Sequence, residues 1–316
     1  MDVVLRLIVK FKVARGVQDA KAMVRYMRMT AATGNMYGID PSKIVIGGHG
    51  TGGYISLGVA TLDNETELYL PKFLDLTDPT NPIPYVYPPI FGNIYGTDST
   101  YAPIYDTLGN IVGSMPFNIP NHSSYSSEIS MAFNLGGALA DISWLESGDV
   151  PIISFHCEND PYAPIDTGDV IVPTTGDFVV EVMGSRTTQY YANNYGNNDI
   201  FALASISDNF TSAANLNNDG LEGLYVFKTP SPSTNPNVFG ELEEEQGSPW
   251  DWWDNSLYDA VFASLHGAPI GYGAANSLLG NPDMSSMKGN TYLDTIQGYL
   301  NPRMYLVLGL GSGTDI

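Results

Sequence analysis

Residues 37–62, which read YGIDPSKIVIGGHGTGGYISLGVATL, decide the fold of this chain. A short apolar strand at residues 44–46 follows an Asp-Pro-Ser turn, and a tight glycine turn at 47–53 leads into a helix at 54–62. Strand, glycine turn and helix in this order form one unit of a parallel sheet. The segment therefore predicts an α/β protein.

Two elements are predicted before this unit. Residues 3–11 (VVLRLIVKF) are β-branched and apolar, which favours a buried strand. Residues 17–32 carry one apolar stripe at helical spacing, with Lys21, Arg25 and Arg28 on the other face. Gly34 is suited to end that helix. A strand and a helix ahead of the glycine turn extend the alternation that the segment begins.

The alternation continues downstream. Strands are predicted at residues 128–140, 150–156 and 223–228, further β-like content at 177–190, a helical turn at 141–147, and helices at 199–215, 257–266 and 292–300. Residues 63–126 are rich in Pro, Tyr and Asn and show little periodicity, which indicates a long insertion that we interpret as a cap over a site. We expect one α/β domain over residues 1–316, with a mainly parallel sheet flanked by helices.

Gly48-His49-Gly50-Thr51-Gly52 stands between a strand and a helix, which is the setting of the nucleophile elbow G-x-S-x-G. Residues 17–26 precede it as a helix, and Phe155-His156-Cys157-Glu158-Asn159-Asp160-Pro161 follows a later strand. Together these segments resemble the esterase/lipase branch of the α/β-hydrolase superfamily, well over residues 15–60 and 128–170 and weakly over the last third.

This resemblance implies carboxylic ester hydrolysis, a catalytic acid at Asp160, and an oxyanion hole built on the elbow. The elbow residues concerned are Gly48, Gly50, Thr51 and Gly52. The family's first strands and its glycine-rich oxyanion loop have no counterpart here, so we expect a fold that is incomplete at the N-terminal side.

The chain departs from the family pattern at the residues that carry the chemistry. Gly50 occupies the position of the nucleophilic serine, and glycine has no side chain to attack an ester. Thr51 is either a substitute nucleophile or an ordinary β-branched residue that begins a helix. Asp160 is either the catalytic acid or a turn-forming residue that caps local N–H groups. His266 is either the general base or the polar end of a helix.

Composition limits the class of partner. The chain has 316 residues, 34 acidic and 13 basic, and a net charge of −21. Residues 1–28 carry +5 and the remainder −26, so the body would repel nucleic acid and anionic lipid. The single cysteine, Cys157, excludes an intramolecular disulfide and a cysteine-based zinc site. We expect no metal, no cofactor and no membrane span, and an exported protein by composition, although residues 1–14 lack the shape of a signal peptide.

These observations leave two functions open. The first is an esterase-like protein whose catalysis is impaired or lost, with a small-molecule ester as its ligand. The second is a non-catalytic binding or surface protein that uses either the hydrolase pocket or a polymer-binding or carbohydrate-binding platform. Three of the four tryptophans, Trp250, Trp252 and Trp253, would form that platform, and core packing is the alternative for them.

Overall fold

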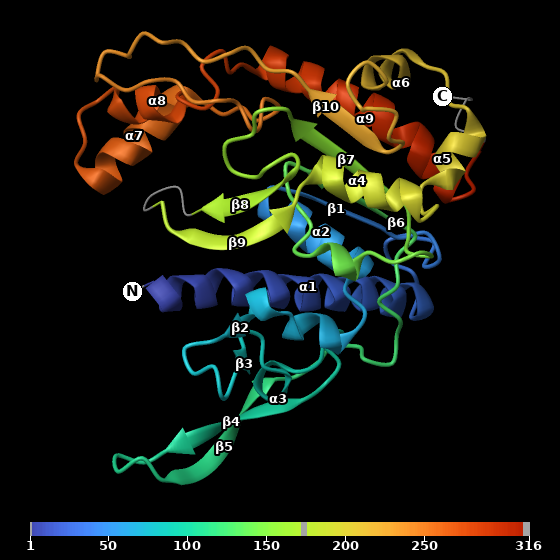
Figure 1. Ribbon diagram of the computed structural model, residues 1–316, viewed down its shortest axis with the longest axis vertical. Coiled ribbons are helices and arrows are strands. Elements are labelled where there is room, and N and C mark those ends of the chain that lie inside the picture. The colour runs from blue at the N-terminus through green and yellow to red at the C-terminus, as the bar shows by residue number, and fades with distance from the viewer. Residues whose placement is uncertain (1, 172–175, 312–316) are drawn as a thin grey trace.

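A four-stranded parallel sheet organises the molecule in a computed structural model that describes residues 2–171 and 176–311 (Figure 1). Its strands lie in the order β1 (Val45–His49), β6 (Met131–Leu135), β7 (Ile152–Cys157) and β10 (Leu224–Phe227). The register pairs Val45 with Met131, Ala132 with Ile152, and Leu224 with Ser154. Every residue of β7 and β10 is buried, as expected for parallel strands covered on both faces.

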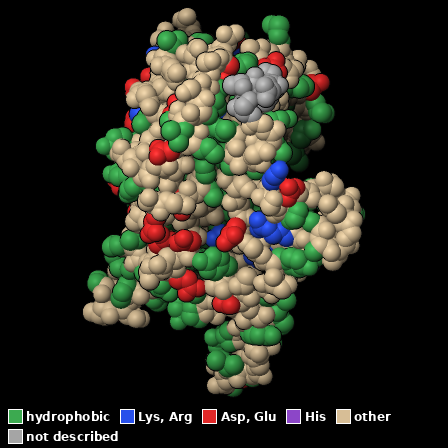
Figure 2. All heavy atoms as spheres, turned by 90° about the vertical axis from the view of Figure 1, so that its right-hand side faces the viewer, with side chains coloured by type: hydrophobic (Ala, Val, Ile, Leu, Met, Phe, Trp, Pro, Cys, Tyr) green, Lys and Arg blue, Asp and Glu red, His purple; other side chains and the backbone are tan. Residues whose placement is uncertain are grey.

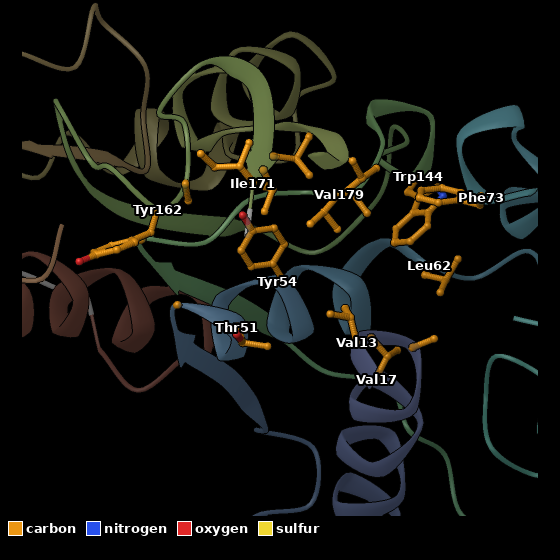
Figure 3. A pocket seen from close by; sticks show the side chains of 18 of the residues that line it. Val13, Val17, Thr51, Tyr54, Leu62, Phe73, Trp144, Tyr162, Ile171 and Val179 are labelled. Atoms are coloured by element: carbon orange, nitrogen blue, oxygen red, sulfur yellow. The ribbon is translucent and has the colours of Figure 1, made fainter. Parts of the chain in front are cut away.

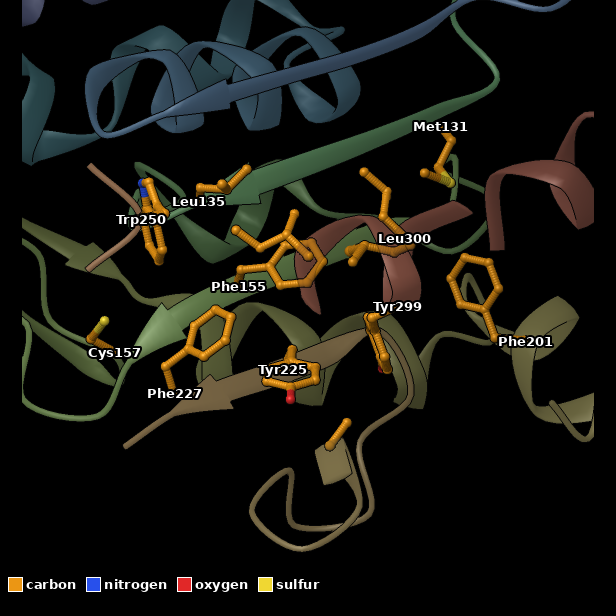
Figure 4. Packing of buried hydrophobic residues seen from close by; sticks show 13 residues of the cluster. Met131, Leu135, Phe155, Cys157, Phe201, Tyr225, Phe227, Trp250, Tyr299 and Leu300 are labelled. Atoms are coloured by element: carbon orange, nitrogen blue, oxygen red, sulfur yellow. The ribbon is translucent and has the colours of Figure 1, made fainter. Parts of the chain in front are cut away.

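Two hydrophobic clusters cover the two faces of this sheet. On one face, α1 (Asp2–Ala32), α2 (Thr51–Thr61) and α4 (Ser185–Asn194) pack around Val17, Leu57 and Ile152. On the other face, α5 (Asp199–Ala204), α6 (Asn209–Ala214) and α9 (Ser286–Val307) pack against aromatic side chains of the strands, among them Phe155 and Tyr225 (Figure 4). The predicted α/β class, with a parallel sheet flanked by helices, is confirmed at this level.

The prediction of a strand at residues 3–11 is wrong, because these residues are the first turns of helix α1, which runs to Ala32. A short apolar run does not distinguish a strand from a helix by periodicity alone. Gly16 does not interrupt the helix. A Cβ at that position would lie 2.5 Å from Cδ1 of Ile55, so the glycine allows α1 to approach α2 closely.

Residues 63–126 form an extended layer on the far side of α1 from the sheet (Figure 1). Its elements are η1 (Glu65–Tyr69), η2 (Pro71–Phe73), β2 (Leu74–Asp75), β3 (Ile83–Pro84), α3 (Pro88–Phe91), β4 (Thr100–Tyr105) and β5 (Ile111–Asn118). The β4–β5 hairpin projects from the body, and most of its side chains are exposed. Arg25 of α1 holds this layer, since its guanidinium donates to the carbonyl oxygens of Tyr95, Gly96 and Asn121.

Two further predictions are corrected in detail. Residues 177–190 are not β-like throughout: strand β9 (Phe178–Met183), paired with β8 (Thr167–Ile171), is followed at once by helix α4. The helix expected at 199–215 is two short helices, because Ser205 adopts a left-handed conformation (φ 50°) that ends α5. The remaining elements are η3 (Ile142–Trp144), α7 (Asn255–His266) and α8 (Tyr272–Ser277). Within the described residues, no helix is long and apolar enough to cross a membrane.

Candidate functional site

The candidate site lies where the sheet strands end at their carboxyl side. β1 ends in His49, β6 is followed by Gly136, and Asp160 comes three residues after β7. These three residues line one cavity of about 450 Å³. Ligand sites of open parallel sheets occur at this edge, because the loops after the strands meet there.

The backbone around Gly50 has the geometry of a sharp strand-to-helix elbow. Gly50 adopts φ 54° and ψ −118°, and its N–H donates to the carbonyl oxygen of Leu135 over 2.8 Å. A Cβ at Gly48 would lie 2.2 Å from backbone atoms of Gly52, so a glycine at position 48 is needed for the close approach of strand and helix. A Cβ at Gly50 would meet nothing within 4 Å, so the position opens onto free space.

Thr51 is the first residue of α2, and its side chain lines the cavity (Figure 3). The N–H groups of Gly53 and Tyr54 donate to the carbonyl oxygen of Gly50. As in the first turn of every helix, the N–H groups of Thr51 and Gly52 have no carbonyl acceptor within the helix itself. The elbow therefore offers backbone donors to the cavity, while Gly50 offers no nucleophile.

Asp160 is held at the cavity by its own loop. Its Oδ1 accepts hydrogen bonds from the N–H groups of Tyr162 (2.8 Å) and Ala163 (3.1 Å), which is the capping arrangement expected of an Asn-Asp-Pro turn. Its side chain is only 3% exposed, and Oδ2 lies 3.7 Å from Nε2 of His156. Burial raises the pKa of the Asp160 carboxyl, and the nearby His156 opposes that rise.

His156 has a structural role in the buried sheet. Its Nε2 lies 3.0 Å from the carbonyl oxygen of Ala163, which can only accept, so Nε2 carries the proton. Its Nδ1 then accepts from the hydroxyl of Ser185, whose Oγ in turn accepts from Nδ2 of Asn134. Burial lowers the pKa of His156, so the ring is neutral and fully hydrogen-bonded.

The structure does not bring His266 to Asp160. His266 ends helix α7, which Gly267 terminates in a left-handed conformation, and its ring packs on Phe262 with centroids 4.5 Å apart. It is absent from the cavity wall. Of the two alternatives for this residue, the polar end of a helix describes its position.

A serine and a histidine that are far apart in the sequence meet at the cavity. Nε2 of His49 lies 2.8 Å from Oγ of Ser248 and 4.0 Å from Oδ2 of Asp251. The His49 ring also packs edge-on against Trp250, with centroids 5.6 Å apart. Ser248 lies 199 residues from His49 in the sequence, on the loop after β10. No local sequence pattern links the two residues.

The cavity wall is apolar away from this end. Figure 3 shows Val13 and Val17 of α1, Leu62 at the end of α2, Phe73 of the inserted layer and Val179 of β9 around one space. The hydroxyl of Tyr54 points into the same space and is buried without a hydrogen-bond partner among the described residues. Burial is the main cause that raises the pKa of Tyr54, and Asp160 adds to the rise.

The three neighbouring tryptophans do not form a common platform. Trp250 is buried in the core beside Phe227, Trp252 is about half exposed, and Trp253 lines a second cavity of about 330 Å³. Ser248 and Tyr162 line both cavities, so the two spaces adjoin at the serine. In the part of the chain that the structure describes, no group of His, Cys, Asp and Glu side chains is arranged to hold a metal ion.

Comparison with known proteins finds no matching family model, no matching curated protein and no matching solved structure.

Proposed function

We propose that this chain is an esterase-like member of the α/β-hydrolase class that binds a neutral molecule with a long apolar chain, and that it no longer performs chemistry at the elbow. The observation that carries this proposal is the cavity of about 450 Å³ that begins at Gly50 and Thr51. Its polar groups gather at one end, and valine, leucine and aromatic side chains line the rest. Such a space fits an acyl chain with its polar head at the elbow.

The charges at the polar end favour a neutral head group over a carboxylate. Asp160 lies in the wall with its carboxyl buried, and Asp251 lies 4.0 Å from His49 just outside. A ligand carboxylate placed here would meet repulsion from both aspartates and would lose its hydration. We therefore propose an ester or a fatty alcohol as ligand class, in preference to a free fatty acid.

A brominated fatty alcohol tests the binding proposal, because Trp144 lines the apolar part of the cavity and bromine quenches tryptophan fluorescence on contact. Addition of 12-bromododecanol is expected to quench part of the fluorescence of the native protein and much less that of Trp144→Phe. Ala14→Phe, which fills the cavity from α1, should weaken binding measured by calorimetry at least tenfold. Met23→Phe, an exposed position on the same helix, is the matched control. Equal affinity of both variants would reject the cavity as the binding site.

A Gly50→Ser variant tests the loss of elbow chemistry. Serine restores a hydroxyl at the family position, but His156 uses both ring nitrogens in the core and His266 lies in α7. We expect no gain over the native rate with a p-nitrophenyl ester, because His49, which also lines this cavity, already contacts Ser248 through Nε2. A gain of tenfold or more would show that the elbow keeps a working base.

A further inference from the structure

His49 of the elbow contacts Ser248, a residue of the loop after β10, over 2.8 Å between Nε2 and Oγ. We propose that Ser248, activated by His49, is a relocated nucleophile that cleaves an ester whose apolar acyl group fills the first cavity and whose polar alcohol occupies the second. This inference rests on the proposed function, because it names the reaction and the substrate class of the same site. The geometry that carries it is the 2.8 Å contact at the junction of the two cavities.

The loop that carries Ser248 is fitted against the catalytic edge of the sheet. A Cβ at Gly247 would lie 2.8 Å from Oδ1 of Asp160 and 3.1 Å from Cδ2 of Tyr162, so only glycine allows this approach. Ser248 is therefore placed beside the end of β7 as well as beside the end of β1. Its hydroxyl lies at the polar end of the acyl cavity, where a carbonyl group would stop.

The two cavities differ in chemistry, which defines the two halves of the substrate. The first is walled by aliphatic and aromatic side chains and suits an acyl chain. The second is lined by Glu244, Asp251, Asn276 and Asn281 together with Trp253, which are the hydrogen-bonding and aromatic groups that bind hydroxylated molecules. An ester bond between a fatty acyl group and a sugar or polyol would span the junction at Ser248.

His49 is able to take and return the proton. In the tautomer with its proton on Nδ1, Nε2 accepts the hydrogen bond from the Ser248 hydroxyl. When Nε2 gains the serine proton, the resulting imidazolium lies 4.0 Å from the Asp251 carboxylate, which stabilises the positive charge. The His49 side chain is 44% exposed, so water also reaches the pair.

The reaction balances in two displacements. Oγ of Ser248 attacks the ester carbonyl carbon while His49 takes the hydroxyl proton, and collapse of the tetrahedral intermediate breaks the bond to the alcohol oxygen, which takes the proton from His49. Water then attacks the acyl-serine ester as His49 takes its proton. The acid leaves, and the proton returns to Ser248. The open N–H of Thr51, on the wall of the same cavity, is the donor available for the developing oxyanion.

A phosphonylating reagent and an ester assay test this proposal together. We expect fluorophosphonate treatment of the native protein to add one label, which peptide mass spectrometry places on Ser248. Turnover of p-nitrophenyl octanoate should fall at least 100-fold in Ser248→Ala and in His49→Gln. Ser231→Ala, an exposed serine on the same loop, is the matched control and should keep the native rate.

The binding measurement separates this inference from the proposed function. Retained quenching of Trp144 by 12-bromododecanol in Ser248→Ala, together with the lost turnover, would support a nucleophile that acts in an intact pocket. Native turnover in Ser248→Ala, a label on another residue, or neither label nor turnover in the native protein would overturn the inference, even if the alcohol binds. Labelling of Ser248 without alcohol binding would reject the first cavity as the acyl-binding site and would still support Ser248 as the nucleophile.

Discussion

Gly50 illustrates at the scale of a single residue what the sharp turn between β1 and α2 requires of the backbone. Its φ of 54° and ψ of −118° belong to a region that side chains other than glycine seldom occupy. A serine at this position would store backbone strain. The glycine adopts the same turn without that strain.

Substitution of Gly50 by alanine is expected to lower the free energy of unfolding by about 1–3 kcal/mol, because of the backbone conformation and not because of crowding. Urea denaturation measures this effect. Gly52→Ala is the matched control, since its added Cβ also meets nothing within 4 Å and its position in the first turn of α2 favours alanine. If both variants unfold at the same urea concentration, the strain argument at Gly50 is wrong.

Glu67 gives the fold a pH dependence. Its side chain accepts a hydrogen bond from the N–H of Asn64 in a capping box, and burial raises its pKa from 4.5 to about 7. The folded state therefore holds the proton more tightly than the unfolded chain between these two values. The contribution of Glu67 to the free energy of unfolding is fully present below pH 4.5 and is lost as the pH rises through 7.

Glu67→Gln is expected to flatten this part of the pH profile, because glutamine keeps the capping acceptor and has no proton to lose. Urea denaturation at pH 4.5, 5.5, 6.5 and 7.5 measures the slope, with the range set by the pKa values of 4.5 and about 7. Asp149, whose pKa burial raises to about 6, leaves a residual slope. Glu65→Gln on the same turn should retain the native slope, and a native slope in Glu67→Gln would contradict the assignment.

Helix α1 shows at the scale of an element why a local sequence pattern does not predict which layers of the fold a helix joins. It lies between the sheet and the layer formed by residues 63–126, and it contacts both (Figure 1). Arg25 is almost wholly buried, and its three hydrogen bonds go to carbonyl oxygens of Tyr95, Gly96 and Asn121. A charged side chain on the face opposite the apolar stripe thus attaches the inserted layer to α1.

Arg25→Met is expected to loosen that layer. It leaves three carbonyl groups without their donor at a cost of ~2 kcal/mol or more. Hydrogen exchange followed by mass spectrometry should show faster exchange in residues 88–121 and unchanged exchange in β6 and β7. Met23→Leu, at an exposed position of the same helix, serves as control. Unchanged exchange in the inserted layer would show that other contacts hold it.

At the scale of the whole molecule, the net charge of −21 acts on the stability of the fold. Figure 2 shows acidic side chains distributed over one face, with few basic ones among them. Repulsion between like charges favours expansion of the chain, and salt screens it over a Debye length of about 10 Å at 0.1 M.

Sodium chloride is therefore expected to raise the melting temperature by several degrees between about 0.01 and 0.5 M, most steeply at the low end where screening changes most. Differential scanning fluorimetry at fixed pH measures this rise. Sucrose, which strengthens burial without screening charge, is the control for a general solvent effect. A melting temperature that falls or stays level with salt would show that the acidic groups do not repel one another in the folded state.

The sequence by itself determined the alternation of strands and helices around the glycine turn. Buried parallel strands are nearly continuous apolar runs, and Gly48 and Gly50 are required by backbone geometry within a few residues. The position of Asp160 at a strand end followed from the same local pattern. These features depend on short segments, whose residue types carry the relevant physics.

Only the tertiary structure decided the course of residues 3–11 and the partners of the polar side chains. The apolar run at the start is compatible with either element, and in the structure it continues helix α1. His49 and Ser248 are separated by 199 residues, and their 2.8 Å contact depends on the parallel order of the sheet and on Gly247 beside Asp160. Local propensity carries no information on such pairings, because long-range packing alone creates them.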